Sequence, residues 1–143
     1  NAFIAILIVI LIIVIGVIFD MIGVSVTASD VKSFNSMASK KVRGSKTALM
    51  LIKNAEKVSA FCNDVIGDVC GILSGSIGII ISNFLSDKLN INSSIITLIV
   101  TALIAALTIG GKAMGKSYAI NKCDVIVFKF SKIISLFKRE VKR

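Results

Sequence analysis

Three long apolar segments, separated by polar stretches, set the pattern of this sequence. Residues 2–19 carry no charge, and a helix of that length reaches roughly 27 Å, close to the hydrocarbon thickness of a bilayer. Two further apolar segments follow a basic connector, and each is also long enough to cross. The pattern predicts membrane-spanning helices over about 2–24, 59–85 and 94–116. Glycine and serine are dense in the second helix and predict a break near 75–78.

The polar stretches predict shorter elements. The basic connector, residues 31–57, has helical periodicity from Ser45, with Ser45 as the N-cap and Gly44 as the preceding break. A loop over 86–94 ends where Asn92 or Ser93 caps the third span. The segment 121–140 is predicted to form an amphipathic juxtamembrane helix on or in the inner leaflet. Its apolar stripe consists of Ile126, Phe130, Ile133, Ile134 and Phe137.

Composition agrees with a membrane protein. Hydrophobic residues make up 55% of the 143 residues, charged residues make up 17%, and the mean hydropathy is +0.92. A soluble domain is about 45–50% apolar and about 25% charged, so a soluble globule and a disordered chain are both poor descriptions. The predicted fold class is an all-α membrane protein: three transmembrane helices, a cytoplasmic connector helix and a C-terminal juxtamembrane helix in one domain, 1–143.

The start of the chain admits two other readings. A secretory signal peptide is the alternative for the first apolar segment, but it needs a basic flank that residue 1 does not supply. Because the chain begins with Asn1 rather than Met, we expect a trimmed fragment.

The charge distribution predicts orientation. The net charge is +9, and the basic residues gather in 32–57 and 122–143, without the aromatic-studded basic face of a nucleic-acid binder. We therefore expect no nucleic-acid partner. Positively charged segments stay in the cytoplasm, so the N-terminus is predicted outside and the C-terminus inside. This predicts a multi-pass protein of the cell (plasma) membrane whose basic segments meet an anionic inner leaflet.

Enzyme chemistry is not indicated. The chain has no His, which removes the commonest general base. No nucleophile–base pair or metal box is visible, and the glycine-lysine run over 110–117 lacks phosphate-loop spacing. Cys62, Cys70 and Cys123 form no CxxC motif and are expected to be small apolar packing residues.

Polar residues at membrane depth are the candidates for function, because they are costly there and usually face an interior or a pathway. They form three clusters, each in the cytoplasmic half of its span by the predicted topology: Asp20 with Ser25, Thr27, Ser29 and Asp30; Asn63 with Asp64 and Asp68; and the glycines, lysines and serine of 110–117. Hard cations such as Mg²⁺ and Na⁺ prefer this set of oxygen donors. Alternatively, the hydroxyls and glycines only pack helices, and an acid of the second cluster pairs with Lys112 or Lys116.

This arrangement resembles the transmembrane domain of the CorC/cyclin-M (CNNM) family of magnesium and cobalt transport and efflux proteins. The family's Ser-x-Ser-Glu motif is similar to residues 27–30, its asparagine-bearing stretch to residues 63–68, and its Gly-Glu-x-x-Pro-Lys signature to residues 111–116. The resemblance implies a homodimer and a site for Mg²⁺, with Co²⁺ or Na⁺ as alternatives. The ligands that it implies are Thr27, Ser29, Asn63 and the carbonyl of Gly111, with Asp30 of lower weight.

The chain departs from the family signature at two positions. Lys112 stands where the family has Glu, and Gly115 stands where it has Pro. An ammonium beside a cation site is repulsive in a partly dry environment. One hypothesis is that Lys112 pairs with Asp64 or Asp68 and plugs the site. The other is that Lys112 extends toward the cytoplasm and leaves Asp64 and Asp68 as replacement metal ligands.

Three function classes follow from these observations. The first is a CorC-like transporter or efflux domain for a divalent cation. The second is a membrane scaffold or partner subunit whose site is closed by the Lys112 ion pair. The third is a small pore former, which the basic amphipathic tail would suit.

Overall fold

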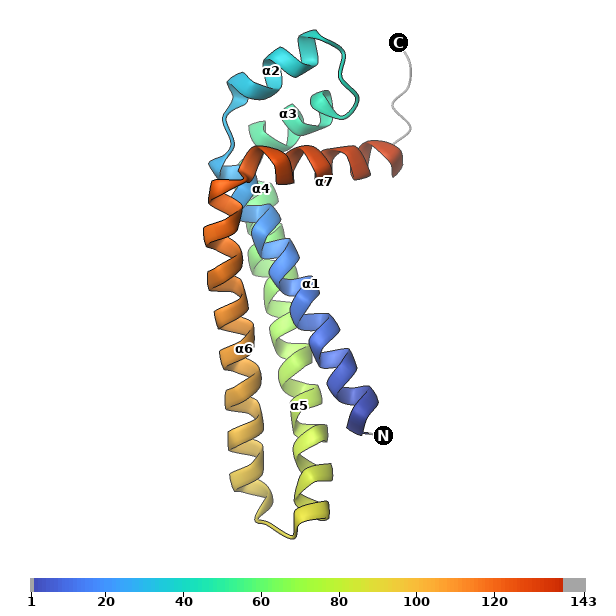
Figure 1. The fold of residues 1–143 in the computed structure, drawn as a ribbon, viewed down its shortest axis with the longest axis vertical. Coiled ribbons are helices and arrows are strands. Elements are labelled where there is room, and N and C mark those ends of the chain that lie inside the picture. Colours follow the sequence, from blue (N-terminus) through green and yellow to red (C-terminus); the bar gives the residue numbers. More distant parts are fainter. Residues whose placement is uncertain (1, 138–143) are drawn as a thin grey trace.

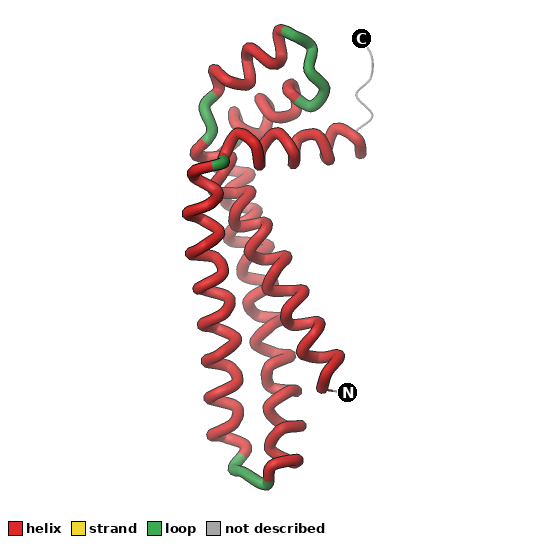
Figure 2. Tube along the Cα trace, in the orientation of Figure 1, coloured by secondary structure: helices red, strands yellow, loops and turns green. Residues whose placement is uncertain are grey.

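The computed structural model describes residues 2–137, and that part of the chain is built from helices without a strand. Figure 2 shows the helices joined by short loops. Three rods, α1, the continuous stretch α4–η1–α5, and α6, lie side by side, with α2, α3 and α7 gathered at one end (Figure 1). The elements are α1 Ala2–Ala28, α2 Val31–Ser39, α3 Ser45–Lys53, α4 Ala55–Ala60, η1 Phe61–Ile66, α5 Gly67–Leu89, α6 Ser93–Asn121 and α7 Cys123–Phe137.

The three predicted spans are present, and each is longer than predicted. The helices long and apolar enough to cross a membrane are Phe3–Ala28, Ala55–Leu89 and Ser93–Asn121. Large apolar side chains point outward along them; Leu98 is 71% exposed and Ile72 is 69% exposed. A water-soluble bundle of this size would turn such side chains inward. The three helices therefore fit a multi-pass membrane protein.

Small residues bring the rods together. Gly78 lies so close to Ile104 of α6 that an added Cβ would come within 2.6 Å of its Cδ1 atom. Ser82, which is buried, bonds its hydroxyl to that of Thr97 at 2.9 Å across the same interface. Close approach through small side chains is the usual packing of membrane helices.

The predicted break near 75–78 is wrong. α5 runs through these residues without interruption, because Gly78 is occupied by the contact with α6 rather than by a turn. The irregular turn lies instead at Phe61–Ile66, which forms a π-helix at the start of the second span. At the far end, Asn90 adopts a left-handed conformation that ends α5, and Asn92 caps α6 by accepting from the backbone N–H of Ser94, as predicted.

The connector contains more helix than its sequence predicted. Asp30 caps an additional helix, α2, by accepting a hydrogen bond from the backbone N–H of Lys32. Gly44 breaks the chain before α3, as predicted, with a φ of +91° that favours glycine. The prediction that Ser45 is the N-cap of α3 is wrong. Ser45 is already helical, and its hydroxyl donates to the Val42 carbonyl.

The helix α7 lies across the end of the bundle and packs on α3 (Figure 1). It occupies Cys123–Phe137 of the predicted 121–140, and residues 138–140 are outside the described part of the chain. Its buried stripe is Val127, Ser131 and Ser135, which faces a small core around Phe34 and Ala48. Of the predicted apolar stripe, Ile133 is 52% exposed and Phe137 is 90% exposed, so an apolar flank of α7 faces outward.

Candidate polar site in the helix bundle

The most deeply placed charge in the bundle is Asp20 of α1. Its side chain is 4% exposed, and the nearest cation is the ammonium of Lys116 on α6, with Nζ 3.9 Å from Oδ2. That distance is longer than the 2.7–2.9 Å of a charge-assisted hydrogen bond. The same Oδ2 atom has no hydrogen-bond partner among residues 2–137. Burying a carboxylate oxygen without a hydrogen-bond donor costs free energy. This oxygen can therefore accept a further donor.

Asn63 supplies the second such oxygen. It lies in the π-helix η1, where its amide Nδ2 donates to the hydroxyl of Ser59 at 3.2 Å. The Oδ1 atom of Asn63 is buried against Gly23 of α1, where a Cβ at Gly23 would lie. This oxygen has no hydrogen-bond partner within the described residues. A π-turn inserts one extra residue into a helix and is frequent at functional sites. Here it lies where the amide of Asn63 enters the bundle.

The packing contacts bring the charges to one level of the bundle. α1 and α5 run antiparallel, with Gly16 against Cys70 and Gly23 against Asn63. Asp20 lies between the two glycines, which places it about level with Gly67. The ammonium of Lys112 extends from α6 to this same Gly67, 3.1 Å from the position of an added Cβ. Asp20 and the two lysines of α6 therefore meet at nearly the same depth.

α6 can approach α1 closely because glycines face it. A Cβ at Gly115 would lie 2.9 Å from Cγ of Met21, and a Cβ at Gly111 would lie 3.1 Å from a methyl of Val17. The backbone of α6 is thus held against α1 on the side from which Lys112 and Lys116 extend. Gly111, a predicted carbonyl ligand, serves in this contact.

Asp64 and Asp68 lie on the exposed side of η1 and α5. Neither forms the ion pair with Lys112 that the plug hypothesis describes; in the described part of the chain the ion pair is Lys116 with Asp20. The reason is geometric, because Lys112 extends along the inner side of α5 at Gly67 while both acids face outward.

The remaining predicted ligands, Thr27, Ser29 and Asp30, lie at the end of α1. The hydroxyl of Thr27 donates to the Val24 carbonyl at 2.8 Å, and that of Ser29 donates to the Ser25 carbonyl at 2.8 Å. Asp30 is engaged as the N-cap of α2. Of the residues predicted as ligands, Asn63 is the one that extends a free oxygen into the bundle.

Sequence reasoning placed Asp20 in a polar cluster but did not select it as a ligand, and it missed the pairing with Lys116. A signal was present, because Asp20 is the one charged residue of α1. The motif resemblance drew attention instead to residues 27–30. Across the described residues no group of three or more His, Cys, Asp and Glu side chains is placed to hold a metal ion. The oxygens available to a cation here are therefore mixed carboxylate and amide.

Comparisons with protein-family models, with curated proteins and with solved structures found no match for the chain.

Proposed function

We propose that this chain is a membrane transport domain that binds a hard cation at an oxygen site between α1, η1 and α6. The observation that carries the proposal is the buried carboxylate of Asp20, whose Oδ2 has no hydrogen-bond partner among the described residues. Ionisable side chains within membrane-spanning helices usually mark ion pathways or binding sites. The unpartnered Oδ1 of Asn63, on the same side of α1, supplies a second donor.

The chemistry of the donors favours a particular class of cation. Carboxylate and amide oxygens suit Mg²⁺ and Na⁺, whereas Zn²⁺ and copper prefer imidazole or thiolate. The resemblance to the CorC/cyclin-M family points to Mg²⁺ or Co²⁺ and to a homodimer. We propose Mg²⁺ as the first candidate, with Asp20 and Asn63 as ligands and Asp64 and Asp68 as acids that attract the cation to the bundle.

The proposed orientation follows from the basic end of the bundle. The exposed lysines of α2, α3, α4 and α7 lie at that end. By the positive-inside rule we propose that this end is cytoplasmic and that the N-terminus of α1 is outside. We propose the cell membrane as the location. α2 and α3 then form the cytoplasmic connector, and α7 is the juxtamembrane helix.

A second candidate is a scaffold or partner subunit in which the charges stabilise the bundle and no cation enters. The ion pair between Lys116 and Asp20 favours it. Against it stand the length of that contact and the exposure of Lys116, whose side chain is 52% exposed. A half-exposed ammonium at this distance is free to leave without unfolding any element.

The two candidates make opposite predictions for Lys116→Gln. In the transporter, the ammonium competes with the cation for Asp20, so the variant binds Mg²⁺ several-fold more tightly. In the scaffold, removing the ammonium leaves a buried charge alone and lowers thermal stability. Thermal unfolding of detergent-purified protein over a Mg²⁺ titration separates these outcomes. Lys112→Glu, which restores the acid of the family signature, is expected to strengthen Mg²⁺ binding further.

The direct test is Asp20→Asn. The purified wild-type chain is expected to gain thermal stability with increasing Mg²⁺ or Co²⁺, as a ligand-bound folded state must, and Asp20→Asn is expected to lose that response. Asp87→Asn is the matched control, because Asp87 is an exposed acid at the opposite end of α5. An equal response in all three proteins, or none with any of Mg²⁺, Co²⁺ and Na⁺ at millimolar concentration, would overturn the proposal.

A further inference from the structure

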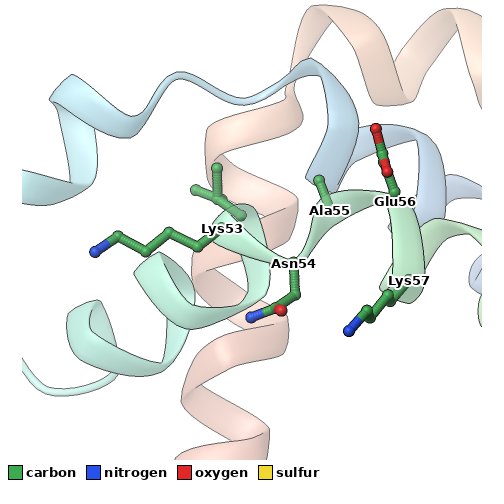
Figure 3. A pocket seen from close by; sticks show the side chains of 6 residues that line it. Lys53, Asn54, Ala55, Glu56 and Lys57 are labelled. Atoms are coloured by element: carbon green, nitrogen blue, oxygen red, sulfur yellow. The ribbon is translucent and has the colours of Figure 1, made fainter.

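The bend between α3 and α4 forms an open hollow of about 410 Å³, lined by Ile52, Lys53, Asn54, Ala55, Glu56 and Lys57. Figure 3 shows that the nitrogen ends of Asn54 and Lys57 extend to the same side of the bend, that Lys53 extends from the end of α3, and that Glu56 points to the opposite side. The lining therefore carries two lysines and one acid, and the side occupied by Asn54 and Lys57 presents hydrogen-bond donors and positive charge.

These donors are available to a ligand. Lys53 and Lys57 are exposed, and neither forms an ion pair with another described residue. The amide of Asn54 donates to the Met50 carbonyl at 2.9 Å, which leaves its second N–H free. The ammonium of Lys57 and the amide N–H of Asn54 extend to one side of the hollow, and Lys53 extends away from them from the end of α3. If the flexible side chain of Lys53 turns toward them, the three groups together select an anion with several acceptor oxygens.

The depth of the hollow along the bundle identifies the anion. The contacts of Ser82 with Thr97 and of Gly78 with Ile104 set the antiparallel register of the second span against α6. Extended toward the connector, this register places Phe61 about level with Tyr118. Both rings face outward, at 56% and 58% exposure respectively. Tyr side chains are enriched at the hydrocarbon–headgroup boundary, so Tyr118 marks that boundary, and Phe61 lies at about the same level on the second span.

The basic residues lie just beyond this boundary. Lys57 is one turn from Phe61, and Lys122 is one turn from Tyr118, each about 6 Å farther along its helix. The headgroup layer is roughly 5–8 Å thick on each side of the hydrocarbon. The hollow therefore opens at the depth of lipid phosphates. The outward apolar flank of α7, with Ile133 and Phe137, lies at the same end of the bundle.

We propose that the hollow at the α3–α4 bend binds the phosphate of an anionic phospholipid, with Lys53 and Lys57 as its cationic contacts and Asn54 as a hydrogen-bond donor. Bound lipid would fix the angle at which α3 continues into the second span. Because the hollow is separate from Asp20, this proposal stands or falls independently of cation binding.

The test compares lipid dependence in matched variants of the full chain. In wild type, phosphatidylglycerol added to detergent-purified protein is expected to raise the thermal unfolding temperature more than phosphatidylcholine does. The double variant Lys53→Gln/Lys57→Gln is expected to need on the order of 10-fold more phosphatidylglycerol for the same shift, since each basic residue near an anionic surface contributes several-fold. Lys40→Gln/Lys41→Gln is the control, because these exposed lysines carry the same charge but lie in the α2–α3 turn.

Two outcomes would overturn the proposal. An equal loss of lipid response in both double variants would mean that diffuse charge, rather than the hollow, attracts the lipid. Stabilisation by inorganic phosphate as strong as that by phosphatidylglycerol would mean that the hollow takes a free anion instead. A third variant, Asn54→Ala, sharpens the result: it keeps the charge and is expected to weaken the response less than loss of both lysines.

Discussion

The two halves of the bundle use the same packing device and differ in what they do with polar groups. In the half near the α5–α6 turn, glycine and serine bring helices together, and the buried hydroxyl of Ser82 is bonded both to Thr97 and to a carbonyl of its own helix. In the half near the connector, Gly23 and Gly67 also make room, but for Asn63 and Lys112. There, Asp20 and Asn63 keep oxygens without partners among residues 2–137. Both halves contain satisfied hydroxyls, such as Ser82 in one and Ser25, which donates to the Ala119 carbonyl, in the other, but the unpartnered buried oxygens found among the described residues lie in the connector half.

The largest effect on this contrast is expected from Gly78→Leu. The added side chain cannot fit against Ile104, so α5 and α6 must separate, at a cost of about 1–3 kcal/mol in the free energy of unfolding. Gly71→Leu is the control, because an added Cβ at Gly71 meets nothing within 4 Å. Thermal or denaturant unfolding in detergent measures both. Equal destabilisation by the two substitutions would show that the change in helix propensity, rather than the contact with Ile104, determines the loss of stability.

Gly23→Ala tests the other half and is expected to act on binding more than on stability. The new methyl occupies the place of the Asn63 Oδ1 atom, so the amide must turn away from the bundle. We expect roughly a tenfold loss of Mg²⁺ affinity, about 1.4 kcal/mol, the order of one lost ligand hydrogen bond or contact. Gly71→Ala is the matched substitution. Unchanged affinity in Gly23→Ala would remove Asn63 from the proposed site.

The smallest effect is expected from Ser82→Ala, which removes the bond to Thr97. Hydrogen bonds between membrane helices contribute about 0.6 kcal/mol on average, so the unfolding temperature should fall only slightly and cation affinity should not change. Ser76→Ala is the control, because the hydroxyl of Ser76 is exposed and bonds only to its own helix at the Ile72 carbonyl. A change in cation affinity in Ser82→Ala would contradict the separation of the two halves.

The sequence predicts well those features that depend on nearby residues or on whether lipid or water surrounds a segment. An uncharged run such as 2–19 is costly outside lipid, so hydropathy alone finds the spans. The cap at Asn92 was also predictable, because it depends on residues two positions apart. The helix α2, whose cap is Asp30, was missed although Val31, Phe34 and Met37 recur at helical spacing, because a polar helix of nine residues does not stand out within a basic connector.

The candidate site was less predictable, because it depends on register between rods. Nothing near Asp20 in the sequence indicates that Lys116 will lie beside it, since that pairing follows from the packing of Gly111 and Gly115 on α1. The π-helix at Phe61–Ile66 has no local signature either. Asn63 was selected through the motif resemblance; its Oδ1 is buried without a partner among the described residues, and its role as a ligand stays a prediction.

The placement of Asp20 also bears on how the protein is made. Chains are synthesised from the N-terminus, so α1 reaches the bilayer long before the ribosome has translated Lys116. During that interval the acid lacks the ammonium of Lys116. An Asp costs at most about 2.5–3.5 kcal/mol, the value at the centre of an inserting helix, and Asp20 lies nearer the end of α1. The many isoleucines and valines of α1 offset this cost at about 0.3–0.6 kcal/mol each. The high hydropathy of α1 is therefore enough to offset the cost of inserting Asp20 before Lys116 is present.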